Sequence, residues 1–223
     1  MRDAIGQLSG SYNRKIKVGQ YDLVKVGHNA PFRFYAVDLN VELGEGAYGK
    51  VYKAYSVNSG NGLIIEEYPF VAKIVPQDIF DKKEFEILAR YEVNTDQPTN
   101  VGEDVYLFTE FHKGSAINFK QLSGLTFEER IDFICKTMLQ LNLMHHNTPT
   151  TKSALAHLDL KPDNILGDLS ESRIIDFGEA LDLEDSQTSR QSDLRGSPQM
   201  IPPEMPLARR RLLNFVPLAL LDY

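Results

Sequence analysis

The stretch HLDLKPDN at residues 157–164, followed by DFG at residues 176–178, decides the fold of this chain. Taken singly, Asp159 is compatible with an ordinary turn residue and Asn164 with a helix cap, because Asp and Asn are common in both places. Short apolar pairs, Ile165-Leu166 and Ile174-Ile175, lie between the two motifs and predict short strands. Together the two motifs indicate a site built on loops, and the upstream sequence supplies its possible partners.

A glycine-rich stretch, GEGAYGKV at residues 44–51, lies inside a predicted strand–turn–strand segment from Val41 to Tyr55. Glycines at these spacings allow backbone N–H groups to approach phosphates closely. Glycine-rich turns are common, so this stretch alone indicates little. Its position between two strands distinguishes it from the dinucleotide-binding fingerprint, which leads from a strand into a helix.

Lys73 lies in a predicted strand that runs from Tyr68 to Val75. Alternation along a strand places Val71, Lys73 and Val75 on one face, where an unpaired charge would be costly. The following segment, Asp78 to Tyr91, has helical spacing, and Glu84 within it is the natural carboxylate partner. A solvated surface pair is the alternative when these two residues are considered alone.

These five segments, in this order, resemble the eukaryotic protein kinase family: a glycine-rich loop, a strand lysine, a helix glutamate, the catalytic loop and the Asp-Phe-Gly motif. The resemblance runs from about Val41 to Glu204, where PPE at residues 202–204 is similar to the end of the activation segment. Five motifs in family order do not arise by chance, so the turn and cap interpretations fail. Lys161, two residues after Asp159, follows the pattern of serine/threonine kinases.

The resemblance implies a role for each matched residue, with ATP and Mg²⁺ as cofactors. Asp159 would accept the proton of the substrate hydroxyl, and Lys161 would steady the transferred phosphoryl group. Lys73, paired with Glu84, would hold the α- and β-phosphates. The metal would be held by Asn164 and Asp176. The residues implied in ATP binding are Gly44, Glu45, Gly46, Ala47, Tyr48, Gly49, Val51, Val71, Lys73, Glu110, His112 and Leu166.

The composition is that of an ordinary globular protein and argues against several other classes. Acidic residues outnumber basic ones by 31 to 24, a balance that argues against nucleic-acid binding. One cysteine, Cys135, excludes an internal disulfide framework, and its place on a predicted helix favours packing in the core. No signal peptide or membrane span is expected, so a cytoplasmic location follows, either in the producing cell or in a host reached without a classical signal. Protein substrates with Ser or Thr acceptors are the implied partners, and the oligomeric state is left open.

The expected fold class is α+β, with a strand-rich N-lobe and a helical C-lobe that is incomplete after the activation segment. The expected divisions are residues 1–40 as an N-terminal extension, 41–110 as the N-lobe, 111–204 as the hinge and upper C-lobe, and 205–223 as an atypical tail. A helix is predicted from Phe127 to Met144, with Thr126 as its N-cap. Its spacing places one apolar face on Phe127, Ile131, Ile134, Met138 and Leu141. The tail is expected to cover exposed apolar surface or, less favourably, to touch a membrane.

Two departures from the family pattern keep rival functions open. Leu158 replaces the arginine that usually precedes the catalytic aspartate, and no aspartate–tryptophan–glycine pattern follows Glu204. A protein kinase is the first interpretation. A nucleotide-binding scaffold with weak or no transfer activity comes second, and a small-molecule phosphotransferase comes third.

Overall fold

The computed structural model describes residues 1–27, 29–46, 49–91, 96–117, 119–146, 154–167 and 171–182. The chain divides into two compact units, Met1–Phe111 and His112–Tyr223, so residues 1–40 belong to the first unit. Ala47 and Tyr48 of the glycine-rich stretch lie outside the described residues. The predicted end of the activation segment and the tail lie outside them as well.

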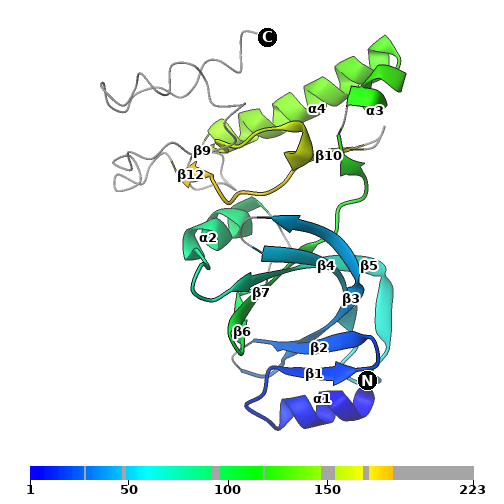
Figure 1. The fold of residues 1–223 in the computed structure, drawn as a ribbon, viewed down its shortest axis with the longest axis vertical. Coiled ribbons are helices and arrows are strands. Elements are labelled where there is room, and N and C mark those ends of the chain that lie inside the picture. The colour runs from blue at the N-terminus through cyan, green and yellow to red at the C-terminus, as the bar shows by residue number, and fades with distance from the viewer. Residues whose placement is uncertain are drawn as a thin grey trace. The chain divides into compact units, whose positions relative to one another are not determined.

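Unit 1 is a strand-rich domain (Figure 1). Its elements in chain order are α1 (Arg2–Ser9), β1 (Lys15–Val18), β2 (Tyr21–Val26), β3 (Arg33–Gly46), β4 (Gly49–Val57), β5 (Ile64–Pro76), α2 (Lys82–Tyr91), β6 (Thr99–Val101) and β7 (Asp104–Glu110). The described strands of this unit form one seven-stranded sheet in the order β1-β2-β3-β4-β5-β7-β6. Every pairing in it is antiparallel.

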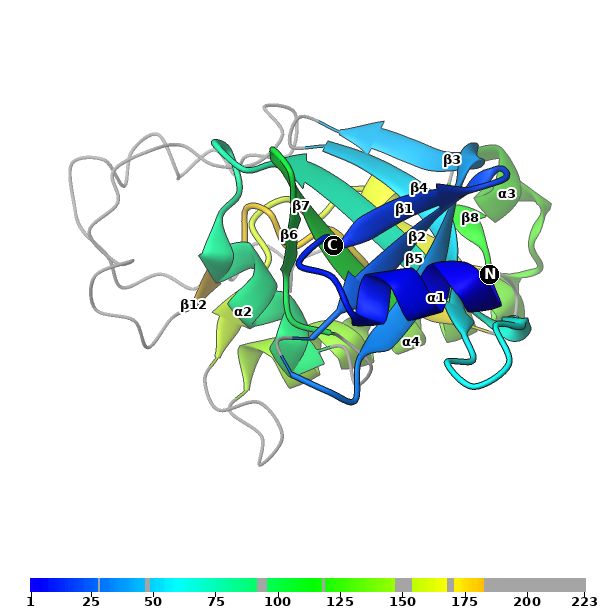
Figure 2. The ribbon, with the colours of Figure 1, turned by 90° about the horizontal axis from the view of Figure 1, so that it is seen from below.

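The sheet curls so that its two ends approach each other, and Figure 2 shows β1 and β2 close to β6 and β7. Val24 and Val26 of β2 share an apolar cluster with Val101 of β6 and Phe108 of β7. The amino group of Lys15 on β1 lies 3.1 Å from the hydroxyl of Tyr106 on β7 and 3.3 Å from the carboxylate of Asp22. Strands from the start and the end of unit 1 therefore share one apolar core.

Helix α1 packs against the outside of this curled sheet. Its apolar positions Ala4, Ile5 and Leu8 are buried in a second cluster with residues of β2, β3 and β4. Lys25 is 3% exposed, and its amino group donates to the carbonyls of Leu8 and Ser11, each at 2.5 Å. Because the C-terminus of a helix carries partial negative charge, this cation stabilises the end of α1 and holds it on the sheet.

Lys73 lies on the face of the sheet that points away from the first apolar cluster, because its strand neighbour Ala72 belongs to that cluster. On β5, Lys73 lies opposite Val51 of β4 and Leu107 of β7. Because strand alternation also places Val71 and Val75 on this face, its surroundings are apolar. Helix α2 begins at Lys82, four residues later than the start of the helical pattern in the sequence, and its Phe85 packs with Val105 and Leu107. This apolar contact fixes α2 against the face that carries Lys73.

Unit 2 combines helices with short strands. Its described elements are β8 (Ser115–Ala116), α3 (Phe119–Gly124), α4 (Phe127–His145), β9 (Leu155–Ala156), the 3₁₀ turn η1 (Pro162–Asn164), β10 (Ile165–Gly167), β11 (Ser172–Ile174) and β12 (Leu181–Asp182). Strand β10 pairs with β11 and β8, and β12 pairs with β9. Together with unit 1, these elements confirm the α+β class.

Helix α4 begins where the sequence predicts. The Thr126 hydroxyl accepts a hydrogen bond from the N–H of Glu129, while the Glu129 carboxylate accepts one from the N–H of Thr126. This capping box satisfies two backbone donors that the first turn leaves without helical partners. The N-cap prediction is confirmed.

The burial of α4 differs from the sequence expectation. Leu141 and Met144 are buried, but the other apolar residues predicted to share a face with Leu141 are exposed. Cys135 is also exposed, so the prediction that it packs in the core is wrong. The predicted helix is present, and its spacing does place these apolar residues on one face. The spacing of apolar residues alone does not say whether other parts of the chain cover that face.

Candidate active site

One set of candidate site residues is the Lys73–Glu84 ion pair in unit 1. The amino group of Lys73 donates a short hydrogen bond to Oε1 of Glu84, which lies in the first turn of α2. The side chains are 21% and 10% exposed, so the pair is largely withdrawn from water. Because an unpaired charge there would be costly, the pairing explains how β5 tolerates a lysine on an apolar face.

The glycine-rich stretch forms the hairpin between β3 and β4, with Gly46 opposite Gly49 and Gly44 opposite Val51. At Gly49 φ is +149°, and a Cβ there would collide with the backbone carbonyl oxygen of Ile74. A glycine is therefore required where the hairpin passes β5. Gly44 and Glu45 are exposed on β3.

The remaining predicted ATP-binding residues are distributed over both units. Val51 and Val71 are half-buried on β4 and β5, and Val71 is on the same face of β5 as Lys73. Glu110 ends β7 and is exposed, while His112 is the first residue of unit 2 and is half-buried. Leu166 lies on β10 opposite Ala116 and is half-buried.

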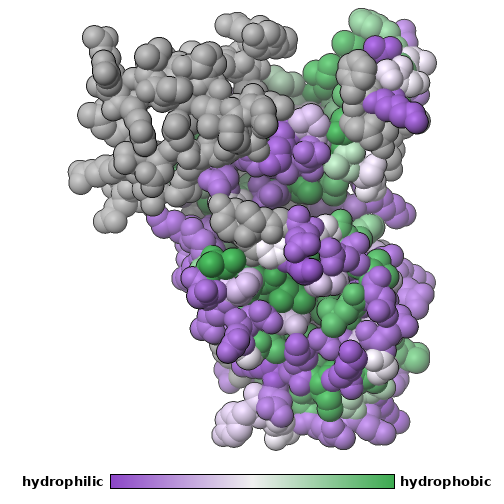
Figure 3. All heavy atoms as spheres, viewed as in Figure 1, coloured by the Kyte–Doolittle hydropathy of each residue, from purple (hydrophilic) through white to green (hydrophobic). Residues whose placement is uncertain are grey.

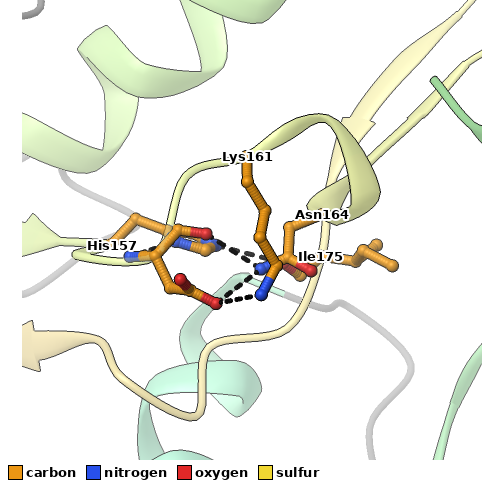
Figure 4. Close-up of polar contacts among 5 residues, drawn as sticks. His157, Lys161, Asn164 and Ile175 are labelled. Carbon is orange, nitrogen blue, oxygen red and sulfur yellow. Dashed lines mark hydrogen bonds and ion pairs between the residues drawn. The ribbon is translucent and has the colours of Figure 1, made fainter. Parts of the chain in front are cut away.

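A second set of candidate site residues is the loop around Asp159 in unit 2, drawn in Figure 4. Oδ2 of Asp159 accepts hydrogen bonds from Nζ of Lys161 at 2.7 Å and from Nδ2 of Asn164 at 3.1 Å. The same Asn164 amide donates to the backbone carbonyl of Asp159 at 2.9 Å. Asp159 and Asn164 are only 7% and 5% exposed, so these bonds hold the carboxylate in one orientation. The hydrogen bond to Asp159 raises the pKa of Lys161 and keeps it cationic.

His157 links this loop to the strand before the DFG motif. Its Nε2 lies 3.0 Å from the carbonyl of Ile175, and its Nδ1 accepts from the N–H of Asp159 at 3.3 Å. Burial lowers the pKa of the imidazole, against smaller raising effects of the Ile175 hydrogen bond and of Asp176 and Asp159. A neutral ring that donates from Nε2 satisfies both contacts.

The backbone at two positions is unusual. Leu158 and Asp176 have φ values of +62° and +63°, a left-handed conformation that costs a bulky residue roughly 1–2 kcal/mol. Each of them adjoins a buried group: Leu158 precedes Asp159, and Asp176 precedes Phe177, whose ring centroid lies 5.4 Å from that of His157. Asp176 itself is exposed. Neither the left-handed turns nor the bridging role of His157 could be deduced from the sequence motif.

The chemistry of these groups fits a nucleotide with a hard divalent cation. Among the described residues, no cluster of three or more His, Cys, Asp or Glu side chains could hold a metal by itself. Mg²⁺ is usually bound by one or two carboxylates together with substrate phosphates, so it does not need such a cluster. Nδ2 of Asn164 donates two hydrogen bonds to Asp159, so the nitrogen of this amide faces Asp159. The amide oxygen of Asn164 and the carboxylate of Asp176 are oxygen donors of the kind that Mg²⁺ prefers.

Comparison with known proteins identifies the family. The model of the protein kinase domain matches residues 37–211, most of the chain, and the chain therefore belongs to the protein kinase family. A titin homolog of Caenorhabditis elegans is 31% identical over 179 residues, 75% of this chain. A probable serine/threonine-protein kinase, fnkA, of Dictyostelium discoideum is 34% identical over 139 residues, 56% of this chain. Serine/threonine-protein kinase PAK 1 of Mus musculus is 27% identical over 172 residues, 74% of this chain.

The chain spans only a small part of these relatives: 1% of the titin homolog, 16% of fnkA and 30% of PAK 1. The family model extends beyond the last described residue, Asp182, into residues 183–211. In the described part of the chain, no helix combines the length and apolar character needed to cross a bilayer.

Proposed function

We propose that this chain is a protein serine/threonine kinase that transfers the γ-phosphoryl group of ATP to hydroxyl groups of protein substrates. The observation that carries the proposal is the buried Asp159 carboxylate, held by Lys161 and Asn164 and fixed from behind by His157. Membership in the kinase family and the names of the relatives support the same reaction class.

In the proposed reaction Asp159 orients the acceptor hydroxyl and takes its proton as the oxygen attacks phosphorus. Lys161, cationic and 2.7 Å from Asp159, neutralises charge that develops on the transferred group. In unit 1, Lys73 holds the α- and β-phosphates while Glu84 fixes the position of its amino group. The backbone of the β3–β4 hairpin covers the phosphates, and Val51, Val71 and Leu166 contact the adenine ring, with Glu110 and His112 at the adenine edge.

We assign Asn164 and Asp176 as the residues that hold Mg²⁺, which when bound offsets the negative charge of the phosphates. The positive φ of Asp176 supports this assignment, because a strained backbone at an exposed carboxylate is typical of a functional position. Calorimetric titration should show ATP binding that Mg²⁺ strengthens. The Asp176→Asn variant should lose most of that Mg²⁺ dependence.

We further propose a reducing, cytoplasm-like compartment as the place of action, since a lone cysteine without a disulfide suits it. We retain residues 41–110 and 111–204 as the two kinase lobes.

The deciding experiment measures autophosphorylation with radiolabelled ATP, followed by identification of the phosphorylated amino acid. The parent chain should form phosphoserine or phosphothreonine. Asp159→Asn and Lys73→Ala should each reduce the rate by at least about a hundredfold, the usual loss when charge stabilisation in the transition state is removed. Asp163→Asn is the matched control, because Asp163 is an exposed carboxylate in the same loop and should keep the parent rate. A parent chain that binds Mg²⁺–ATP without any transfer would contradict the proposal and favour a nucleotide-binding scaffold.

A further inference from the structure

Helix α4 packs on the rest of unit 2 mainly through its second half. Its buried residues, Thr137, Leu141 and Met144, all lie there. Gln140 is half-buried beside them, and the spacing of the four residues places them on one face of the helix. Hydrophobic side chains remain on the surface where α3 and α4 lie (Figure 3). Two of the four inward residues, Thr137 and Gln140, are polar, and the proposed reaction uses neither of them.

Gln140 binds the backbone of β11, which is an edge strand of the described three-stranded sheet. Its Nε2 donates a short hydrogen bond to the carbonyl of Ser172, and its Oε1 accepts one from the N–H of Ile174 at 3.0 Å. Only this orientation of the amide satisfies both contacts, because a carbonyl must accept and an N–H must donate. A neighbouring strand would offer the same two groups, so the side chain of Gln140 takes the place of a further strand on this edge.

Thr137 reinforces the same attachment. Its hydroxyl donates to the carbonyl of Phe133 at 3.0 Å. Because a hydroxyl has a single proton, Thr137 then accepts from the hydroxyl of Ser172, which lies 2.7 Å away. Ser172 is therefore held by α4 through its side chain and through its backbone.

The residue that follows β11 is bonded on both sides to the candidate site. The N–H of Ile175 donates to the carbonyl of Asn164 at 2.9 Å, and its carbonyl lies 3.0 Å from Nε2 of His157. Asp176 comes next in the chain. A displacement of β11 would therefore move Asp176 and disturb both of these hydrogen bonds.

We propose that Gln140 is a positioning residue for the phosphoryl transfer: through β11 it fixes Ile175, and with it Asp176 and the loop around Asp159. The effect on catalysis rests on the proposed function, whereas the hold on Ile175 does not. Displacements pass along hydrogen-bonded segments of this kind, so Gln140 needs no contact with the reacting groups. A misplacement of about 1 Å that originates far from the chemistry can cost on the order of a hundredfold in rate.

The first experiment measures amide hydrogen exchange, residue by residue, in the full chain without ligand. Gln140→Leu removes both hydrogen bonds at similar size, while Gln140→Glu keeps the acceptor and turns a carboxylate oxygen toward the carbonyl of Ser172. Each should make the amide of Ile175 exchange at least about tenfold faster, although the substitution leaves its own partner, the carbonyl of Asn164, in the chain. Asn142→Leu and Asn142→Asp are matched controls that should exchange at the parent rate, because Asn142 is an exposed amide on the same helix.

The second experiment measures autophosphorylation well below the melting temperature of each variant. Both Gln140 variants should lower the rate at saturating ATP by at least about tenfold and change KM for ATP by less than about threefold, because the nucleotide contacts proposed for unit 1 are intact. Parent-like exchange at Ile175 in both variants would overturn the proposal. Faster exchange with an unchanged rate would overturn it as well, since Gln140 would then support only the fold. A parent chain without transfer activity would refute the proposed function, and exchange at Ile175 would still decide whether Gln140 holds this segment.

Discussion

Replacing His157 with phenylalanine tests the contacts that fix the loop around Asp159. An aromatic ring is retained, but the carbonyl of Ile175 and the N–H of Asp159 both lose their buried partner. A buried group left unpaired costs ~1–3 kcal/mol, and the longer 3.3 Å contact lies at the low end, so we expect a loss of about 2–4 kcal/mol. For a chain of this size, that corresponds to a fall of roughly 5–15 °C in Tm.

The pH dependence gives the same substitution a second and more specific readout. Burial lowers the pKa of His157 below its ordinary value of 6.5, so the unfolded chain binds a proton at a higher pH than the folded chain does. The stability that neutral His157 provides is therefore fully present above about pH 6.5 and declines as the pH falls toward the lower folded-state pKa. The parent should lose stability over this interval, and the His157→Phe variant should lose less.

Thermal melts at a series of pH values between 7.5 and 5 provide the measurement. The control is His146→Phe, because His146 is exposed at the end of α4 and its loss should change Tm little. If His157→Phe melts with the parent at pH 7.5, the two hydrogen bonds do not support the loop as we have argued. If the difference in Tm between the parent and His157→Phe does not change with pH, the stability of the loop does not depend on a neutral His157.

Three further predictions concern other parts of the chain. Thr126→Ala removes one half of the capping box and should lower stability by ~1 kcal/mol in chemical denaturation, while Thr126→Ser should preserve it. Gly49→Ala should weaken Mg²⁺–ATP binding in calorimetry with a smaller change in overall melting, because the added methyl group pushes the β3–β4 hairpin away from a carbonyl of β5; unchanged binding would show that the hairpin does not approach the phosphates. Kinase activity should survive phosphatase treatment, because Leu158 cannot pair with a phosphate on residues 183–204; a large loss of activity would show that another cation reads that phosphate.

The sequence predicted those features that local chemistry determines. Strand alternation placed Lys73 on one face with Val71 and Val75, and the capping residues fixed the start of α4. The ion pair between Lys73 and Glu84 also followed, since a charge on an apolar strand face needs a partner. These predictions succeed because they depend on residues that are close in the sequence or on a strong local cost.

Features that depend on distant segments were missed. The helical period placed five apolar residues of α4 on one face, but the exposure of four of them and of Cys135 depends on what packs against the helix. The left-handed backbone at Leu158 has no signal in the sequence, because leucine rarely adopts it. Likewise, residues 1–40 contain ordinary strand patterns, and nothing in them indicates that Lys15 reaches Tyr106.

The contact between Lys15 and Tyr106 has a consequence for folding during translation. The two residues are 91 positions apart in the sequence. Val24 and Val26 likewise pack against residues that are synthesised much later, Val101 and Phe108. During translation at ~5–20 residues per second, the first strands therefore spend several seconds outside the ribosome before their packing partners are synthesised. An apolar edge exposed for that time is a target for chaperones and for premature association with other nascent chains. Strands β1 and β2 are thus synthesised first but can pack fully only after β6 and β7 have been made.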